Sequence, residues 1–421
     1  MVNNSKKSGV SPALIWSVLS LFFFYQFVAR SSFPTVLMEQ FMRYFQLDAT
    51  GIGALTSCYY FVYTLMQVPA GIVVDRFGVR TVATIASALC AVGIFVFVST
   101  SNCYIAGVGQ MLIGFGASFA FVQTLKSVAT WFPVEKTTMM SSITISIGCL
   151  GPVIGGPAVS QIVQKFEWKG LLEGFALVGL LISALIWMIV RDKKTSAGQK
   201  RGDSIFDSLK MVVTSRQAWV LALFTMALYA PLSALGDLWG VSFIKKAYNV
   251  DSGVAVFANN MLYVGLVIGS PTSAYLATLL DSYKKPMVGA VTLCAILMGI
   301  VIFCTGMPVE AIFALFFGLG FCCGAILTYP LAMRIFPESA GGTATSFLNA
   351  MSMVSGVILM PLVGYLINLS WDGTMADGVK FYSLSDYQCG ITAVLVFLIA
   401  GAILSLMMED RSPRGDGKAA K

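Results

Sequence analysis

The chain has 421 residues, of which 57% are hydrophobic and only 11% are charged. Soluble proteins carry about 25% charged residues, so the composition excludes a soluble protein and indicates that the solvent is lipid. The net charge of +7 does not indicate a nucleic-acid partner, because the basic residues fall in loops that would flank a membrane. The chain has no histidine, the commonest metal ligand, and we expect neither a metal site nor a cofactor.

The apolar segments form two groups of six, and each is long enough to cross the hydrocarbon core, which takes about 20 residues. The predicted spans are residues 13–37, 51–74, 80–99, 104–132, 139–163 and 170–190, then 217–243, 253–280, 286–306, 309–336, 342–369 and 387–408. We therefore predict an all-α integral membrane protein with 12 transmembrane helices. It consists of an N-terminal six-helix half (1–190), a central linker (191–216) and a C-terminal six-helix half (217–421).

The placement of lysine and arginine predicts the orientation in the membrane. Of the 27 basic residues, 19 fall on the side of the termini and the linker, and two lie within spans. The remaining six lie on the opposite side, at Arg43, Lys165, Lys169, Lys245, Lys246 and Lys380. Because cytoplasmic loops carry the excess of positive charge, we expect both termini and the linker to be cytoplasmic, in a bacterial inner membrane or its equivalent. The expected partners are the lipid bilayer and a small-molecule substrate, and we expect a monomer.

The two halves repeat one another at an offset of about 204 residues. The segment "FQLDATGIG" (45–53) parallels "YNVDSGVAV" (248–256), and "GFGASFAFVQTLKSVATWFP" (114–133) parallels "GLGFCCGAILTYPLAMRIFP" (318–337). At the same offset Pro157 corresponds to Pro361. Since six spans is an even number, the halves have the same topology and are related by a pseudo-two-fold axis along the membrane normal, an arrangement of secondary transporters.

A tight charged turn, "GIVVDRFGVR", joins the second and third spans. With two parallel six-span halves, this turn resembles the signature of the major facilitator superfamily, in which Gly, Asp and basic residues recur at fixed spacing. The matching residues are Gly71, Asp75, Arg76, Gly78 and Arg80. We expect Gly71 to allow close helix approach and Gly78 to permit the turn. The resemblance implies a latch that closes the cytoplasmic side; the alternative is a simple anchor of positive charge.

The corresponding turn of the second half, "ATLLDSYKKP", keeps Asp281 but lacks the turn glycine, which puts an equally tight latch in doubt. The segments "TLKSVATWFPVEK" and "LGPVIGGP" also resemble the organic-anion branches of the superfamily and the branch of lysosomal dipeptide transporters. The resemblance implies that spans 1, 4, 7 and 10 line a central cavity.

Charged residues within spans are costly and mark function. Arg30 on span 1, Lys126 on span 4 and Asp237 on span 7 qualify. Two cations in the N-terminal half favour a substrate with a carboxylate, phosphate or other anionic group. Asp237 has three interpretations: a partner of Arg30 in an outer gate, the titrating acid of proton coupling, or a carboxylate that reaches the outer surface.

Polar side chains on neighbouring spans extend this candidate substrate site. The remaining candidates are Gln26, Tyr60, Tyr63, Gln123, Asn259, Asn260, Tyr263 and Tyr329. Gln26 lies four residues before Arg30, and Gln123 lies three before Lys126, so each pair shares a helix face. The alternative is that these residues only hold helices together.

These features predict a secondary active transporter that works by alternating access and moves a small polar, anionic or zwitterionic solute, coupled to a proton. No nucleotide-binding loop is present, so ATP does not drive it directly. Alternatives are efflux of amphipathic compounds or of a siderophore, and a non-transporting receptor on the same fold. An enzyme is not expected, because the predicted spans lack a nucleophile motif and an adjacent pair of acids.

Overall fold

The computed structural model describes residues 11–192, 205–376 and 379–413, and these are helical apart from one short hairpin. The helices are α1 (Pro12–Phe27), η1 (Val28–Ser32), α2 (Phe33–Phe45), α3 (Ala49–Phe77), α4 (Val79–Val98), α5 (Cys103–Trp131), α6 (Val134–Ile162), α7 (Trp168–Ile189), α8 (Ile205–Thr214), α9 (Arg216–Pro231), η2 (Leu232–Trp239), α10 (Gly240–Tyr248), α11 (Ser252–Leu279), α12 (Lys284–Phe303), α13 (Val309–Cys323), α14 (Thr328–Ile335), α15 (Glu338–Ser370) and α16 (Leu384–Leu406). Strands β1 (Met375–Ala376) and β2 (Val379–Lys380) pair antiparallel, with Met375 opposite Lys380.

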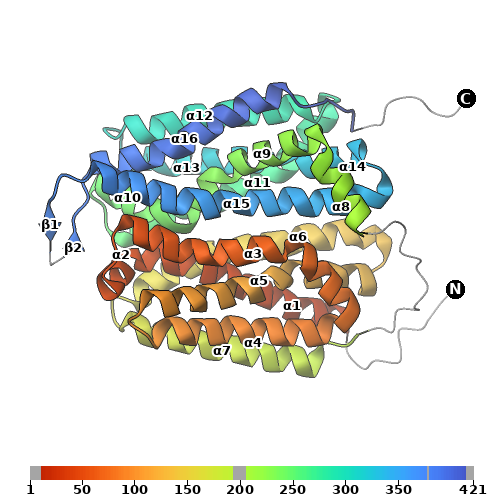
Figure 1. The fold of residues 1–421 in the computed structure, drawn as a ribbon, viewed down its shortest axis with the longest axis horizontal. Coiled ribbons are helices and arrows are strands. Elements are labelled where there is room, and N and C mark those ends of the chain that lie inside the picture. The colour runs from red at the N-terminus through yellow and green to blue at the C-terminus, as the bar shows by residue number, and fades with distance from the viewer. Residues whose placement is uncertain (1–10, 193–204, 377–378, 414–421) are drawn as a thin grey trace, which may run out of the picture.

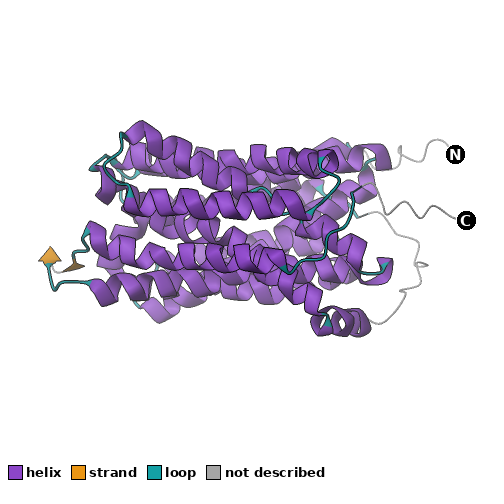
Figure 2. Cartoon of the chain, turned by 90° about the horizontal axis from the view of Figure 1, so that it is seen from above, coloured by secondary structure: helices purple, strands orange, loops and turns teal. Residues whose placement is uncertain are grey.

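The long helices run side by side between two ends of the molecule (Figures 1 and 2). We call the end that carries β1 and β2 the hairpin end and the end that carries α8 the linker end. Helices α1–α7, here the N-terminal bundle, lie below α9–α16, the C-terminal bundle, in the view of Figure 1. Within the described residues, 11 helices are long and apolar enough to cross a membrane, or up to 12 if bent α3 counts as one span. The predicted all-helical membrane fold is therefore confirmed.

Helix α3 is the bent span. Its segments Ala49–Gln67 and Pro69–Phe77 meet at 63°. Proline removes one backbone donor and clashes with the preceding turn, which is the usual cause of a kink in a helix. The bend redirects the end of α3 that carries the charged turn.

The first and seventh spans extend beyond their predicted ends at residues 37 and 243, because their last turns are amphipathic. In α2, Met38, Phe41 and Phe45 are buried, whereas Glu39 and Arg43 lie between them on the opposite face. Hydropathy alone places the end of such a helix where polar residues begin, although the 3.6-residue period of apolar residues continues beyond that point. Helix α10 ends the seventh span in the same way at Tyr248.

The tenth span, predicted as continuous over 309–336, is broken between α13 and α14. Helix α13 packs so closely against α11 that a Cβ on Gly320 would lie 1.9 Å from the carbonyl oxygen of Leu262. At the break, the Ser273 hydroxyl donates to the carbonyl oxygen of Gly324 at 3.2 Å. A broken helix at membrane depth needs such a partner, since no water satisfies the freed carbonyl.

The sequence repeat has a matching structural repeat. Gln46 and Asn249, which follow the first span of each half, both adopt the left-handed conformation, with φ of 52° and 49°. Two residues later, Asp48 and Asp251 cap the next helix. Asp48 accepts a hydrogen bond from the backbone N–H of Gly51 at 2.9 Å, and Asp251 accepts one from that of Val254 at 2.8 Å. The π-helical segments η1 and η2 also occupy corresponding positions in the two spans.

The predicted linker, residues 191–216, contains a helix. Helix α8 occupies Ile205–Thr214 and buries Ser208 and Val212, and the Trp219 indole donates to the Val213 carbonyl at 2.8 Å. Residues 1–10, 193–204 and 414–421 lie outside the described residues. They hold nine of the basic residues counted for orientation, Lys6, Lys7, Lys193, Lys194, Lys200, Arg201, Arg414, Lys418 and Lys421. The orientation and the division at 190 and 217 stay predictions.

The two bundles touch most closely at the hairpin end, where α3 crosses α15. A Cβ on Gly53 would lie 2.4 Å from the carbonyl oxygen of Met360, and one on Gly364 would lie 2.1 Å from that of Ala49. Near the linker end of α3, a Cβ on Gly71 would have no heavy atom within 4 Å. The expected close helix approach at Gly71 is therefore absent, and glycine contacts join the bundles at the opposite end.

Replacing Gly364 with alanine should force α3 and α15 apart. Overpacking costs about 1–3 kcal/mol, so we expect the apparent Tm in detergent to fall by about 3 °C or more. Gly299→Ala is the matched control, because its Cβ would have no heavy atom within 4 Å and alanine favours the helix. Differential scanning fluorimetry compares the two; equal stability would contradict the close contact.

Candidate functional site

A basic and an acidic side chain meet across the two bundles, near the middle of the first and seventh spans. Arg30 Nε lies 3.6 Å from Asp237 Oδ2, and the two side chains are 3% and 0% exposed. The hydroxyls of Tyr60 and Tyr263 donate hydrogen bonds to the two oxygens of the same carboxylate. Asp237 thus accepts from both bundles, since Tyr60 belongs to α3 and Tyr263 to α11.

Both charged residues lie on π-helical turns, η1 and η2, which are uncommon and frequently found at functional sites. The wider turn leaves the carbonyl oxygen of Gly236 open to side-chain donors. It accepts from Ser31 Oγ at 3.2 Å, Thr35 Oγ1 at 3.3 Å and Asn259 Nδ2 at 3.1 Å. Ser31 and Thr35 come from the other bundle, so the two π-helical turns are held against each other directly beside the ion pair.

The guanidinium of Arg30 is only partly satisfied. It donates to the Tyr229 hydroxyl at 3.4 Å and lies 4.3 Å from the centre of the Phe27 ring. Within the described residues its Nε has no hydrogen-bond partner. A bidentate pair would use two parallel N–H donors on one carboxylate, whereas Asp237 offers a single long contact. The Nε–H donor of the guanidinium is therefore unused in this conformation.

The predicted polar residues of spans 1 and 2 lie beside Arg30, and Gln123 lies on span 4. Gln26 accepts from the Tyr59 hydroxyl at 3.0 Å, and Tyr59 stacks on Tyr63 with ring centres 5.7 Å apart. Gln123 is fully buried, and in the described part of the chain neither its Oε1 nor its Nε2 has a hydrogen-bond partner. An unsatisfied buried amide costs about 1–3 kcal/mol, so Gln123 is a costly residue to bury in this conformation.

The predicted residues of the C-terminal bundle have separate roles. Asn260 donates to the carbonyl oxygen of Pro152 on α6 at 2.9 Å and so joins the bundles. Tyr329 donates to Asn349 Oδ1 at 3.3 Å, and Asn349 Nδ2 donates to Gln67 Oε1 at 2.6 Å. Sequence reasoning missed Asn349, whose only signal was an amide within an apolar span.

The structure does not bring Lys126 to Arg30. The Lys126 ammonium donates to the Val74 carbonyl at 2.9 Å and lies 2.7 Å from Asp75 Oδ1, at the bent end of α3. The Asp75 side chain is 62% exposed. Lys126 is therefore part of the charged turn in this conformation, and the expected pair of cations in one cavity reduces to Arg30.

The charged turn is held by a residue that the motif does not contain. Gly78 has φ of 82°, which permits the turn, and a Cβ there would lie 2.5 Å from Asp192. Asp192 Oδ1 accepts from the backbone N–H of Val79 at 2.7 Å and of Arg80 at 3.2 Å, which caps α4. Arg80 Nε donates to the Trp187 carbonyl at 2.9 Å. Arg76 is exposed and lies 5.5 Å from the ring centre of its neighbour Phe77.

The second-half turn is built in the same way without its glycine. Asp281 itself adopts the left-handed conformation, with φ of 48°, and its carboxylate accepts from the Ser412 hydroxyl. Asp410 accepts from the Lys284 backbone N–H at 3.2 Å and the Ser282 hydroxyl at 2.6 Å. In each half an aspartate just after the last span caps the third span. The sequence signal for these two caps was the same position of the aspartate, directly after the last span of each half, in "VRD" and "MED".

Breaking the central pair from either side should destabilise the fold. Arg30→Gln leaves the Asp237 carboxylate unpaired, and Asp237→Asn leaves the guanidinium unpaired; each should cost about 3–5 kcal/mol. The double variant removes both charges and should recover most of the loss. Lys245→Gln, in an ion pair with side chains 30% and 52% exposed, is the control and should change little. Thermal unfolding of the purified proteins measures this, and strictly additive losses would contradict the pairing.

Comparison with known proteins places this arrangement in a family. The sequence profile of the Major Facilitator Superfamily matches residues 18–261 and 238–420. The chain is 24% identical to the uncharacterized transporter YybO of Bacillus subtilis (strain 168), over 79% of this chain and 82% of the relative. It is 22% identical to the probable galactarate/D-glucarate transporter GarP of Escherichia coli (strain K12), over 77% and 81%.

Among solved structures, the chain resembles a bacterial homologue of the human lysosomal transporter Spinster, in an inward-facing and unoccupied conformation. The TM-score is 0.79 at 14% identity, over 94% of this chain and 96% of that one. This likeness bears on the fold, and the matched profile extends over both bundles. The chain therefore belongs to the Major Facilitator Superfamily and is a multi-pass membrane transporter of the secondary type, not an enzyme.

Proposed function

We propose that the chain carries a small organic anion, of the size of a sugar acid, across the membrane together with a proton. The observation that carries this proposal is the buried Arg30–Asp237 pair, in which a single long contact leaves the guanidinium with an unused Nε–H donor. The relative GarP is a probable galactarate/D-glucarate transporter by name. Galactarate and D-glucarate are hydroxylated dicarboxylates, so this relative supports the same substrate class.

Charge balance explains why a proton and an anion would travel together. While Asp237 is ionised, it neutralises Arg30 and repels an entering carboxylate. When Asp237 takes up a proton, the Arg30 guanidinium keeps its charge, since it does not lose a proton in proteins. A substrate carboxylate then replaces Asp237 as its partner. Release of the substrate and the proton restores the internal pair, so Arg30 is paired with one carboxylate in the empty carrier and in the loaded carrier.

Buried polar atoms without a hydrogen-bond partner suit a hydroxylated solute. Besides Gln123, within the described residues Ser127 Oγ, Gln67 Nε2 and Asn259 Oδ1 are buried without a hydrogen-bond partner. Gln123 and Ser127 lie four residues apart on α5 and so share a helix face. Sugar-acid hydroxyls both donate and accept, so they can satisfy amide and hydroxyl groups that a purely apolar ligand would leave unpaired.

The contacts between the bundles support an inward-facing conformation, with the linker end as the cytoplasmic side. Glycine-mediated contacts and the central pair hold the bundles together toward the hairpin end, whereas Gly71 near the linker end faces open space. In alternating access the bundles rock about the central site. The Arg30–Asp237 pair then has two tasks: it neutralises the empty site, and it stabilises closure of the outer side.

Purified protein in liposomes should take up D-glucarate or another sugar acid when the outside is acidified. Arg30→Lys keeps the positive charge but loses the planar fork that matches a carboxylate. We expect its kcat/KM to fall about 10-fold or more, from loss of one charge-assisted hydrogen bond of about 1.5–3 kcal/mol. Gln161→Ala, at an exposed position near the end of α6, is the control and should leave transport unchanged. Unchanged transport in Arg30→Lys would exclude Arg30 from the substrate site.

Asp237→Asn should separate substrate exchange from proton coupling. The amide resembles the protonated acid, so the variant still admits an anion to Arg30 but binds no proton there. We expect exchange of labelled for unlabelled anion to persist, while accumulation driven by a pH gradient falls to the level of simple equilibration. Both are measured on the same proteoliposomes. Accumulation at the wild-type level would rule out Asp237 as the coupling group.

A further inference from the structure

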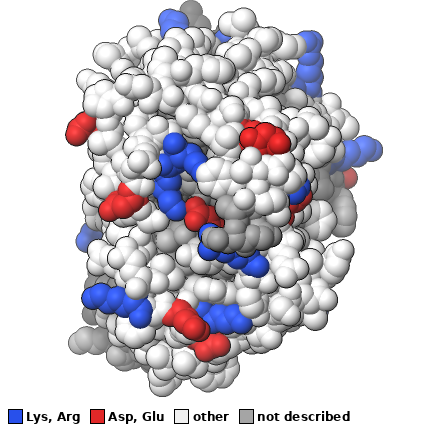
Figure 3. Space-filling view, turned by 90° about the vertical axis from the view of Figure 1, so that its left-hand side faces the viewer, with Lys and Arg blue, Asp and Glu red and all other residues white. Residues whose placement is uncertain are grey.

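Four of the six basic residues that sequence analysis placed on the outer side converge on one pocket at the hairpin end. The pocket has a volume of about 340 Å³ and is lined by Arg43 from α2, Lys245 and Lys246 from α10, and Lys380 from β2. Among its lining residues Glu39 is the one carboxylate. Figure 3 shows charged side chains of both signs spread over this face, from its middle to its lower part and its edges.

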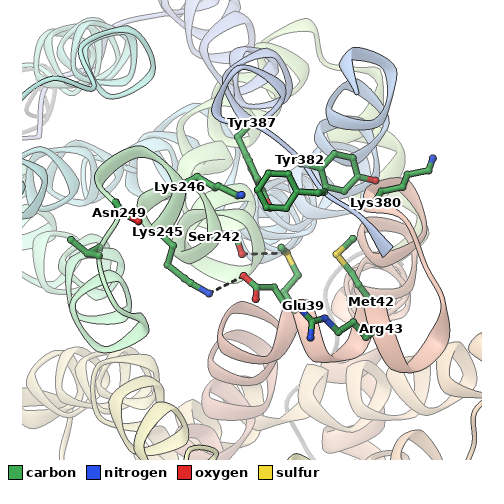
Figure 4. Close-up of a pocket in the computed structure, with 13 residues that line it drawn as sticks. Glu39, Met42, Arg43, Ser242, Lys245, Lys246, Asn249, Lys380, Tyr382 and Tyr387 are labelled. Atoms are coloured by element: carbon green, nitrogen blue, oxygen red, sulfur yellow. Dashed lines mark hydrogen bonds and ion pairs between the residues drawn. The ribbon is translucent and has the colours of Figure 1, made fainter. Parts of the chain in front are cut away.

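The pocket lies where the two bundles meet, and Figure 4 shows its charged side chains coming from both. Met38, Glu39, Met42 and Arg43 belong to the N-terminal bundle, and the rest of the lining belongs to the C-terminal bundle. Tyr382, Tyr387 and Phe381 supply an aromatic wall. A concave site of this volume, with aromatic walls and a few convergent polar groups, has the features of a small-molecule site.

Two of the cations are held by acids of the opposite bundle. Lys245 Nζ lies 2.8 Å from Glu39 Oε1, and Lys380 Nζ lies 3.4 Å from Asp48 Oδ2. All four side chains are partly exposed, and ion pairs of this kind stabilise by about 0–1 kcal/mol. These pairs must break when the bundles separate at the hairpin end. Separation would release the Lys245 ammonium toward water, whereas Lys380 Nζ keeps its 2.6 Å hydrogen bond to Asn368 Oδ1 of its own bundle.

Lys246 differs from these two, because an aromatic ring holds it. Its Nζ lies 3.3 Å from the centre of the Phe381 ring. A cation above an aromatic face keeps its full charge and its hydrogen-bond donors on the open side. A role of the pocket as a latch between the bundles does not need Lys246, whereas a role in binding an anion does.

We propose that this pocket is a second, outer binding site for a small organic dianion, which it collects from the water before the anion reaches Arg30. This inference rests on the proposed function for the identity of the ligand. A dianion suits the pocket because its two acidic groups can replace Glu39 and Asp48 on Lys245 and Lys380. When the outer side closes, the two acids return to their lysines and displace the ligand, so closing of the gate empties the site.

The experiment measures initial D-glucarate uptake into proteoliposomes at low and high salt. Lys246→Gln and Lys246→Gln/Lys380→Gln should raise KM about 5-fold or more with kcat unchanged, and the increase should shrink at high salt because screening already weakens attraction there. Lys165→Gln is the matched control, an exposed lysine beyond the end of α6 at the same end of the molecule. Equal KM in the double variant and the control would overturn the proposal.

Equilibrium dialysis of the purified protein with labelled D-glucarate separates the outer site from the central site. Binding that persists in Arg30→Gln/Asp237→Asn, which removes both central charges, and disappears when Lys246→Gln and Lys380→Gln are added, identifies the outer site, even if no uptake occurs and the proposed function fails. Loss of all binding in a folded Arg30→Gln/Asp237→Asn protein would assign the ligand to the central site and overturn the second site.

Discussion

A guanidinium and a carboxylate placed together in a nearly dry interior are the constraint on which the rest of this structure depends. Neither Arg30 nor Asp237 could remain alone in the bilayer core, because an unpaired buried charge costs several kcal/mol. Their pairing requires that the first and seventh spans approach, and the π-helical turns η1 and η2 make that approach possible. The surrounding hydroxyls of Tyr60 and Tyr263 then hold the carboxylate from both bundles. The pair is also replaceable, since one contact of 3.6 Å does not use the full capacity of the guanidinium.

The polar groups of the molecule are arranged along its long direction in three levels. At the hairpin end, basic residues of both bundles line a pocket, and two of them form ion pairs across the interface between the bundles. Midway lies the Arg30–Asp237 pair, with unsatisfied amides nearby. At the linker end, Lys126 and Asp75 form an ion pair within the N-terminal bundle, and Asp192 caps α4. Each level pairs a cation with an acid, and the proposed transport of an anion would use an exchange of these partners at successive stages.

Much of this organisation was readable in the sequence because the bilayer imposes simple rules. Long apolar segments predicted the spans, and the duplicated segments predicted a repeat that the caps at Asp48 and Asp251 reproduce. Charges within apolar runs singled out Arg30 and Asp237, because nothing but function or pairing keeps an ion at that depth. The same argument misplaced Lys126, since a lysine six residues from a helix end can reach the charged turn with its flexible stem. The argument from charges in apolar runs also did not identify Asn349 or Asp192, because their hydrogen-bond partners are distant in the chain.

The sequence by itself determined that the chain is a membrane protein, that it has two similar halves, and which few ions lie among apolar residues. These properties follow from composition and periodicity, which act on each segment separately. Only the tertiary structure decided that Arg30 faces Asp237 and not Lys126, that Gly53 and Gly364 bring α3 and α15 into contact, and that four cations at the hairpin end share one pocket. The physical reason is that contacts between spans depend on how each helix is rotated, bent and shifted against its neighbours. Packing between the helices fixes these quantities, and the hydropathy of a single helix does not.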